Sequence, residues 1–116
     1  MKEILFYKSK SQRNFIEEFL DTLSNKEVEK VLWVFKLIRE DEFVSTKFYK
    51  KLVNSEDIIE IRVQLSNNNF RFLGFEHNGK LIILTNAFRK KEQKTPKNEI
   101  KLAQKRKKEY LNGGFR

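Results

Sequence analysis

Three stretches of alternating apolar and polar residues decide the fold: DIIEIRVQL at residues 57–65, FRFL at 70–73 and LTNAFRKK at 84–91. Alternation with a period of two is typical of strands that bury one face of a sheet. Turn-forming residues separate these runs, with SNNN at 66–69 and NG at 78–79. The pattern therefore predicts an antiparallel β-meander.

The turns also predict which side chains share a face of this sheet. A two-residue turn at 67–68 places Leu65 opposite Phe70, so that Arg62 and Arg71 emerge on one face in diagonal positions. That face is expected to have a polar end and an apolar end. Its predicted polar members are Arg62, Gln64, Arg71 and Asn86, with Phe88 beside Arg71. Its predicted apolar members are Leu73, Phe75, Ile82 and Leu84.

Helices are expected before and after the meander. A short strand at residues 4–8 leads to apolar residues at helical spacing, which predict a helix over 11–23 and a second one from a cap at Asn25 to about residue 38. Their aromatic side chains are expected in the core. Residues 43–54 are expected to form an irregular connector. The sequence thus predicts a single α+β domain over residues 1–116.

The apolar end of the second sheet face needs a cover, and the last helix is the expected one. Lys94, Thr95 and Pro96 provide a start signal, with proline at the first helical position. The predicted apolar stripe of this helix is Ile100, Ala103, Tyr110 and Leu111. Asn112, Gly113 and Gly114 are expected to end it.

The charge of the chain is unevenly distributed. The formal net charge is +9, and residues 89–108 alone hold ten Lys or Arg and two Glu. Such a segment favours a polyanionic partner, with nucleic acid first and an acidic protein or a membrane surface second, and a solvated helix face is the alternative. The chain has no cysteine, which excludes disulfides, thiolate zinc sites and cysteine nucleophiles. No apolar run is long enough to span a bilayer and no signal peptide is evident, so a cytoplasmic location and no membrane contact are expected.

The two arginines predicted on one sheet face form a candidate phosphate-binding pair, because the guanidinium fork fits phosphate oxygens. The alternative is that Arg62 pairs with Glu60 or Glu76 and has a structural role. His77, the single histidine, is expected at the far hairpin, which leaves no two-histidine ribonuclease mechanism. The carboxylates form no tight acidic cluster of the kind that metal-dependent nucleases use, so neither a metal nor another cofactor is expected.

These motifs resemble a known family. The order IEIR at residues 59–62, FR at 70–71 and NAFRKKEQKTPKNEI at 86–100 is similar to the phage-derived HigB-type branch of the RelE/ParE toxin superfamily. The resemblance covers roughly residues 47–111. Phe70 stands where that branch usually has tyrosine, and Ala87 stands where glycine is common.

The resemblance implies the toxin of a type II toxin–antitoxin system, a ribosome-dependent mRNA endoribonuclease held in check by a helix-turn-helix (HigA-like) antitoxin. In such an enzyme the mRNA 2′-hydroxyl attacks the adjacent phosphate without a metal. The resemblance assigns catalysis to Arg62, Arg71, Lys90 and Lys91, with proton transfer by one of the lysines. It assigns binding of mRNA or ribosomal RNA to Lys51, Phe88, Arg89, Lys94, Lys97, Lys101 and Lys105.

Two other functions are also compatible with the sequence. A ParE-like protein would bind gyrase without cutting RNA, and one fold supports both activities. A non-catalytic phage-derived regulator that binds nucleic acid or protein is the second alternative, and the phenylalanine at position 70 keeps it open.

Overall fold

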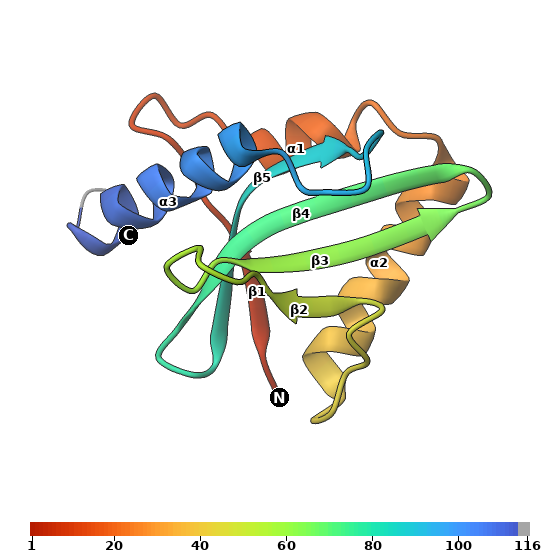
Figure 1. Cartoon of the computed structure of the whole chain (residues 1–116), viewed down its shortest axis with the longest axis horizontal. Helices are drawn as coiled ribbons and strands as arrows, with labels where there is room; N and C mark the ends of the chain where they lie inside the picture. Colours follow the sequence, from red (N-terminus) through yellow and green to blue (C-terminus); the bar gives the residue numbers. More distant parts are fainter. Residues whose placement is uncertain (114–116) are drawn as a thin grey trace.

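A five-stranded sheet with helices on both faces makes up the computed structural model, which describes residues 1–113 (Figure 1). In chain order the elements are β1 (Glu3–Phe6), α1 (Phe15–Leu20), α2 (Asn25–Glu40), β2 (Tyr49–Lys51), β3 (Ile59–Leu65), β4 (Asn68–His77), β5 (Leu81–Arg89) and α3 (Lys97–Leu111). The strand order across the sheet is β1-β5-β4-β3-β2. The predicted α+β class, with a β3–β4–β5 meander and a C-terminal helix, is confirmed.

Two edge strands complete the meander. β1 pairs with β5 in parallel, which makes the sheet mixed. β2 pairs with β3 in an antiparallel sense. The expectation of a wholly irregular connector at residues 43–54 was wrong, because β2 lies within it. A strand of three residues is too short to produce a readable alternation.

The first helix is shorter than predicted. Its N-cap is Asn14, whose side chain accepts a hydrogen bond from the backbone N–H of Glu17 at 3.0 Å. The residues before Asn14 form a turn instead, in which Gln12 has a φ of 68°. The prediction that the helix begins near residue 11 was therefore wrong, because the polar residues there satisfy one another locally.

The second helix begins one residue earlier than predicted, because Ser24 caps it in place of Asn25. Ser24 and Glu27 form a reciprocal capping box, with each side chain bonded to the other residue's backbone N–H. At the far end of the chain, Pro96 is the N-cap of α3 and Lys97 its first residue. Gly113 follows the helix with a φ of 87°, whereas Gly114 lies outside the described residues.

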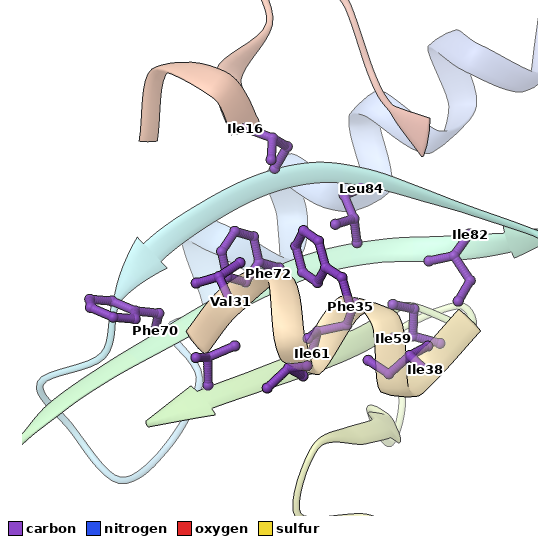
Figure 2. Packing of buried hydrophobic residues seen from close by; sticks show 12 residues of the cluster. Ile16, Val31, Phe35, Ile38, Ile59, Ile61, Phe70, Phe72, Ile82 and Leu84 are labelled. Carbon is purple, nitrogen blue, oxygen red and sulfur yellow. The ribbon is translucent and has the colours of Figure 1, made fainter. Parts of the chain in front are cut away.

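The main core lies between α1, α2 and one face of the sheet (Figure 2). Phe35 of α2 meets Phe72 of β4 with ring centroids 5.1 Å apart, and Phe19 of α1 meets the same ring at 5.6 Å. The expectation that the helix aromatics are core residues holds for these rings. It was wrong for Trp33, which is 50% exposed.

The β3–β4 register differs from the prediction by two residues. Val63 lies opposite Phe70 and Leu65 opposite Asn68, so the turn is at residues 66–67. A shift of two residues leaves every side chain on its predicted face. It brings Arg62 directly opposite Arg71, where a diagonal relation was expected.

A β-bulge interrupts the pairing of β4 with β5. Leu73 lies opposite Asn86 and Gly74 opposite Leu84, which leaves Thr85 as the extra residue. The Thr85 hydroxyl donates to the Leu73 carbonyl at 3.2 Å. The predicted pairing of Leu73 with Leu84 was therefore wrong.

The last helix covers the apolar end of the second sheet face, as predicted. Tyr110 packs on Phe75 with centroids 5.6 Å apart, and Ala103 is buried against Leu73. The membership of this face needs one correction. The hairpin turn takes three residues, 78–80, in place of the predicted two, so Ile83 lies opposite Phe75 while Ile82 and Leu84 join the main core.

Candidate functional site

Arg62 and Arg71 occupy the polar end of the second sheet face, at facing positions of β3 and β4. The Arg62 side chain is 30% exposed and the Arg71 side chain 11%. Two guanidinium groups are thus held side by side, at the surface but largely enclosed. Their charges repel each other, so a neighbouring anion is needed to hold them together.

Glu60 supplies that anion. Its side chain is fully buried, and Oε1 accepts a hydrogen bond from Arg62 Nε at 2.9 Å and lies 3.8 Å from Arg71 Nε. The other oxygen accepts a hydrogen bond from the Thr95 hydroxyl. Thr95 lies in the segment between β5 and α3, so this bond ties the basic segment to the sheet.

Arg71 keeps part of its hydrogen-bonding capacity unused. Nη1 donates to the backbone carbonyl of Phe70 at 3.0 Å, whereas the buried Nε has no hydrogen-bond partner within residues 1–113. Burial lowers the pKa of Arg71, Glu60 opposes that effect, and Arg62 adds to it. The guanidinium is therefore poorly compensated and suited to binding a further anion.

Lys90 lies beside the arginine pair. Its backbone N–H donates to the carbonyl of Asn69 at 2.8 Å, which extends the β4–β5 pairing by one residue. Burial lowers the pKa of the Lys90 amine, and the nearby charges of Arg71, Arg62 and Lys50 lower it further, against the opposing effect of Glu60. The group thus combines positive charge with an increased tendency to release its proton.

Two hollows meet at Arg71. One has a volume of about 420 Å³ and contains Arg62, Arg71 and Gln64 with Lys30 and Lys47. The other, of about 300 Å³, contains Arg71 with Lys90 and Lys91. Asn69 also lines both. A chain of anionic groups could therefore cross Arg71 from one hollow to the other.

Residues 18–108 match the family described as "Phage derived protein Gp49-like (DUF891)". This match spans most of the chain and every residue of the site described above. The chain belongs to this Gp49-like family. No curated protein matches the chain significantly.

Two residues predicted for RNA binding lie away from the arginine pair of this Gp49-like protein. Arg89 is on the α1/α2 side of the sheet, where its guanidinium lies 5.1 Å from the centre of the Phe70 ring. Lys51 is exposed and forms an ion pair of 3.7 Å with Asp57. Lys50 of the same strand lies opposite Glu60 in the β2–β3 register. Its positive charge is one of the causes that lower the pKa of Lys90.

Phe88 shares the face of Arg71, as expected, and lies directly opposite it, where the predicted register had placed Asn86. It is partly buried and packs against the cluster of Ile58, Leu73 and Ala103 beneath α3. Asn86, predicted at the polar end, donates to the side chain of Glu99 at 2.9 Å and so fastens α3 to the sheet. Both residues position the helix beside the arginines.

The remaining predicted lysines are exposed and follow one another along the chain after β5, and the last of them, Lys105, lines a separate hollow with Tyr7 and Phe15. Lys91 lines the smaller hollow. Lys94 lies in the connecting segment, and Lys97, Lys101 and Lys105 follow along α3. Two other basic residues of this helix have structural contacts: Arg106 donates to the Thr85 carbonyl at 2.7 Å, and Lys107 to the Glu56 carbonyl at 2.8 Å.

Sequence reasoning did not assign Lys30, Lys47, Lys50 and Thr95 to the site. Lys30 belongs to α2 and Lys47 to the connector, so only the fold brings them to Arg62. Lys50 needed a β2–β3 register that the sequence did not predict. Glu60 was considered as a partner of Arg62, and that pairing is confirmed.

His77 ends β4 at the distal hairpin, with its ring 5.9 Å from that of Tyr110. Within residues 1–113 no group of three or more His, Asp or Glu side chains is placed to hold a metal ion. None of the helices there combines the length and apolar character that crossing a membrane requires.

Proposed function

We propose that this Gp49-like protein is the toxin of a type II toxin–antitoxin system and cleaves mRNA on the ribosome. The Gp49-like family is related to the RelE-type toxins, which supports the class. The observation that carries the proposal is the facing pair Arg62 and Arg71 above a buried Glu60, with Lys90 alongside. Positive charge held in a preorganised way is what phosphodiester cleavage needs.

In the proposed reaction the RNA 2′-hydroxyl gives up its proton to water, its oxygen attacks the adjacent phosphorus, and the bond from phosphorus to the 5′-oxygen breaks. Arg62 and Arg71 would bind the non-bridging oxygens, whose negative charge increases as the transition state forms. The products are a 2′,3′-cyclic phosphate and a 5′-hydroxyl.

Lys90 is the proposed proton donor to the departing 5′-oxygen. Its position in the smaller hollow places it next to Arg71, and its lowered pKa makes proton release easier than for an ordinary lysine. Lys91, exposed in the same hollow, would add positive charge near the RNA.

The proposed partners are the ribosome with its mRNA and a helix-turn-helix antitoxin. The exposed lysines of α3 would bind ribosomal RNA through release of counterions from its backbone. An antitoxin that covers the arginine face would neutralise the toxin by exclusion of mRNA.

Expression of the chain without an antitoxin tests this function. Growth arrest with cleaved, translated transcripts is the expected result. Intact transcripts together with broken chromosomal DNA would instead indicate a ParE-like gyrase inhibitor. Normal growth and intact nucleic acids would indicate a non-catalytic binding protein.

A further inference from the structure

An aromatic pair lies beside the larger arginine hollow, and the proposed chemistry does not use it. Trp33 of α2, the only tryptophan of the sequence, is 50% exposed. Its ring meets that of Phe48, just before β2, at 5.8 Å and an interplanar angle of 76°. The main core packs against the other side of α2, so it does not require a large aromatic side chain at this exposed position.

Positive charges alternate with these rings. The amine of Lys30 lies 4.7 Å from the centre of the Trp33 ring, and that of Lys47 lies 5.5 Å from the centre of the Phe48 ring. The same two lysines line the larger hollow together with Arg62. The surface between the arginine pair and α2 therefore carries both aromatic rings and positive charges.

The backbone fixes this arrangement. The N–H of Arg62 donates to the carbonyl of Phe48 at 2.8 Å, and the N–H of Phe48 donates to the carbonyl of Ser45 at 3.0 Å. Phe48 is therefore held at the strand that carries Arg62. Phe48 is a fixed part of the hollow's lining, and Trp33 lies against Phe48 just outside that lining.

We propose that Trp33 and Phe48 form a subsite that stacks a base of single-stranded RNA next to the phosphate held by Arg62 and Arg71. Proteins that bind single strands combine cations along the backbone with aromatic rings under the bases. The hollow, at about 420 Å³, is in the size range of small-ligand pockets. The proposal rests on the proposed function, because it takes the bound phosphate to belong to RNA.

The charge alone would also suit an acidic protein segment. Trp33 and Phe48 meet edge to face and leave Trp33 half open to water, with a lysine over each ring. Flat rings interleaved with cations match the alternation of base and phosphate along a nucleic acid. Single-stranded RNA is therefore the occupant that these contacts favour.

Trp33 is itself fluorescent, so binding of a strand at this subsite can be followed by the intrinsic fluorescence of the full chain. The ligand is a short 2′-O-methyl oligoribonucleotide, which lacks the attacking hydroxyl and stays intact. The matched ligand is an abasic strand with the same number of phosphates. The base-containing strand should quench Trp33 and bind more tightly than the abasic one, by about fivefold to about 150-fold per stacked base.

Substitutions test whether Trp33 and Phe48 cause the preference for the base-containing strand. Phe48→Ala keeps the fluorophore and should lose most of the preference for the base-containing strand. Trp33→Ala, followed by anisotropy of a labelled strand, should do the same, and Trp33→Phe should restore it. Leu32→Ala changes the neighbouring exposed position of α2 and should leave the preference intact. Circular dichroism melting curves of all variants establish that they fold.

Equal binding of the two strands by the wild type would overturn the subsite, as would a preference that survives Phe48→Ala. Quenching by an acidic peptide with no response to the base-containing strand would also overturn it and identify a protein partner. The outcome is separable from the proposed function. A base-dependent preference in a protein that leaves translated mRNA intact supports the subsite and rejects the nuclease.

Discussion

Arg62 and Arg71 lie opposite each other on β3 and β4, and their Nε atoms approach the same oxygen of Glu60 at 2.9 and 3.8 Å. The carboxylate holds together two cations that would otherwise repel each other. Its second oxygen is bonded to Thr95, so the same buried group also fixes the start of the basic segment. Glu60 is therefore a positioning residue of the proposed site.

Replacement of Glu60 by glutamine keeps the shape and removes the charge. We expect Glu60→Gln to lower the free energy of unfolding by about 1–3 kcal/mol, since a buried acceptor of charged hydrogen bonds is lost. Thr95→Val should have a smaller effect of the same sign. Urea denaturation measures both, with the exposed Glu92→Gln as control. Unchanged stability in Glu60→Gln would contradict the positioning role.

The pKa of Lys90 offers a direct test of its environment. Nuclear magnetic resonance titration of the Lys90 side chain should give a midpoint below the ordinary lysine value of 10.5. Arg71→Ala should raise this pKa, because the Arg71 charge is among the causes that lower it. If Lys90 donates the proton, cleavage should decline as pH rises through the lowered pKa. An ordinary midpoint in the wild type would count against this assignment.

The same shift makes stability depend on pH. Between the lowered pKa of folded Lys90 and the value of 10.5, the unfolded chain binds more protons than the folded chain. Stability therefore gains a contribution that rises with pH across that window. Lys90→Met should remove this contribution, as urea denaturation at a series of pH values would show.

The bulge between β4 and β5 makes a prediction at Gly74. A Cβ built there would lie 2.0 Å from the carbonyl oxygen of Ile83, which is backbone and unable to move aside. We expect Gly74→Ala to cost at least the 1–3 kcal/mol typical of overpacking. Gly79→Ala meets no atom within 4 Å but has a φ of 72°, and should cost about 1–2 kcal/mol. A larger loss at Gly79 would contradict the observed register.

The exposed lysines of α3 are predicted to bind ribosomal RNA. Lys101→Glu with Lys105→Glu should weaken ribosome binding, and the slope of log K against log salt should fall by about 0.7–0.9 for each lost phosphate contact. The control is Lys26→Glu with Lys80→Glu, which changes the charge equally at exposed sites outside α3. Equal losses in the two double variants would mean that only net charge matters.

The sequence alone was sufficient to predict the meander and to place Arg62 and Arg71 on the same face of the sheet. Side-chain alternation with a period of two survives an error of two residues in register, so the wrong turn position did not matter for the faces. The facing contact itself required the observed turn at residues 66–67. A run of several polar turn-forming residues cannot indicate which two of them form the turn.

The bulge was not predictable from alternation, because it breaks alternation. With Thr85 as the extra residue, Ile83, Phe88 and Lys90 share the face that carries Arg71, although 83 differs in parity from the other two. The hairpin turn at residues 78–80 is one residue longer than predicted and moves Leu84 to the other face, and the bulge then returns Phe88 to the predicted face. The position of Trp33, Phe48 and Lys30 beside Arg62 was not predicted for another reason. The spacing of apolar residues in a helix does not show which flank of that helix will lie beside an arginine far away in the sequence.

The central claim is most directly tested by primer extension on mRNA in a translating extract, with wild type, Arg71→Ala and Arg89→Ala. Arg89 is on the same hairpin but the opposite face, which makes it the matched control. We predict discrete cleavage by wild type and Arg89→Ala, and a loss of about 100-fold or more in Arg71→Ala. Cleavage by Arg71→Ala at the wild-type rate, or none by the wild type, would contradict the account.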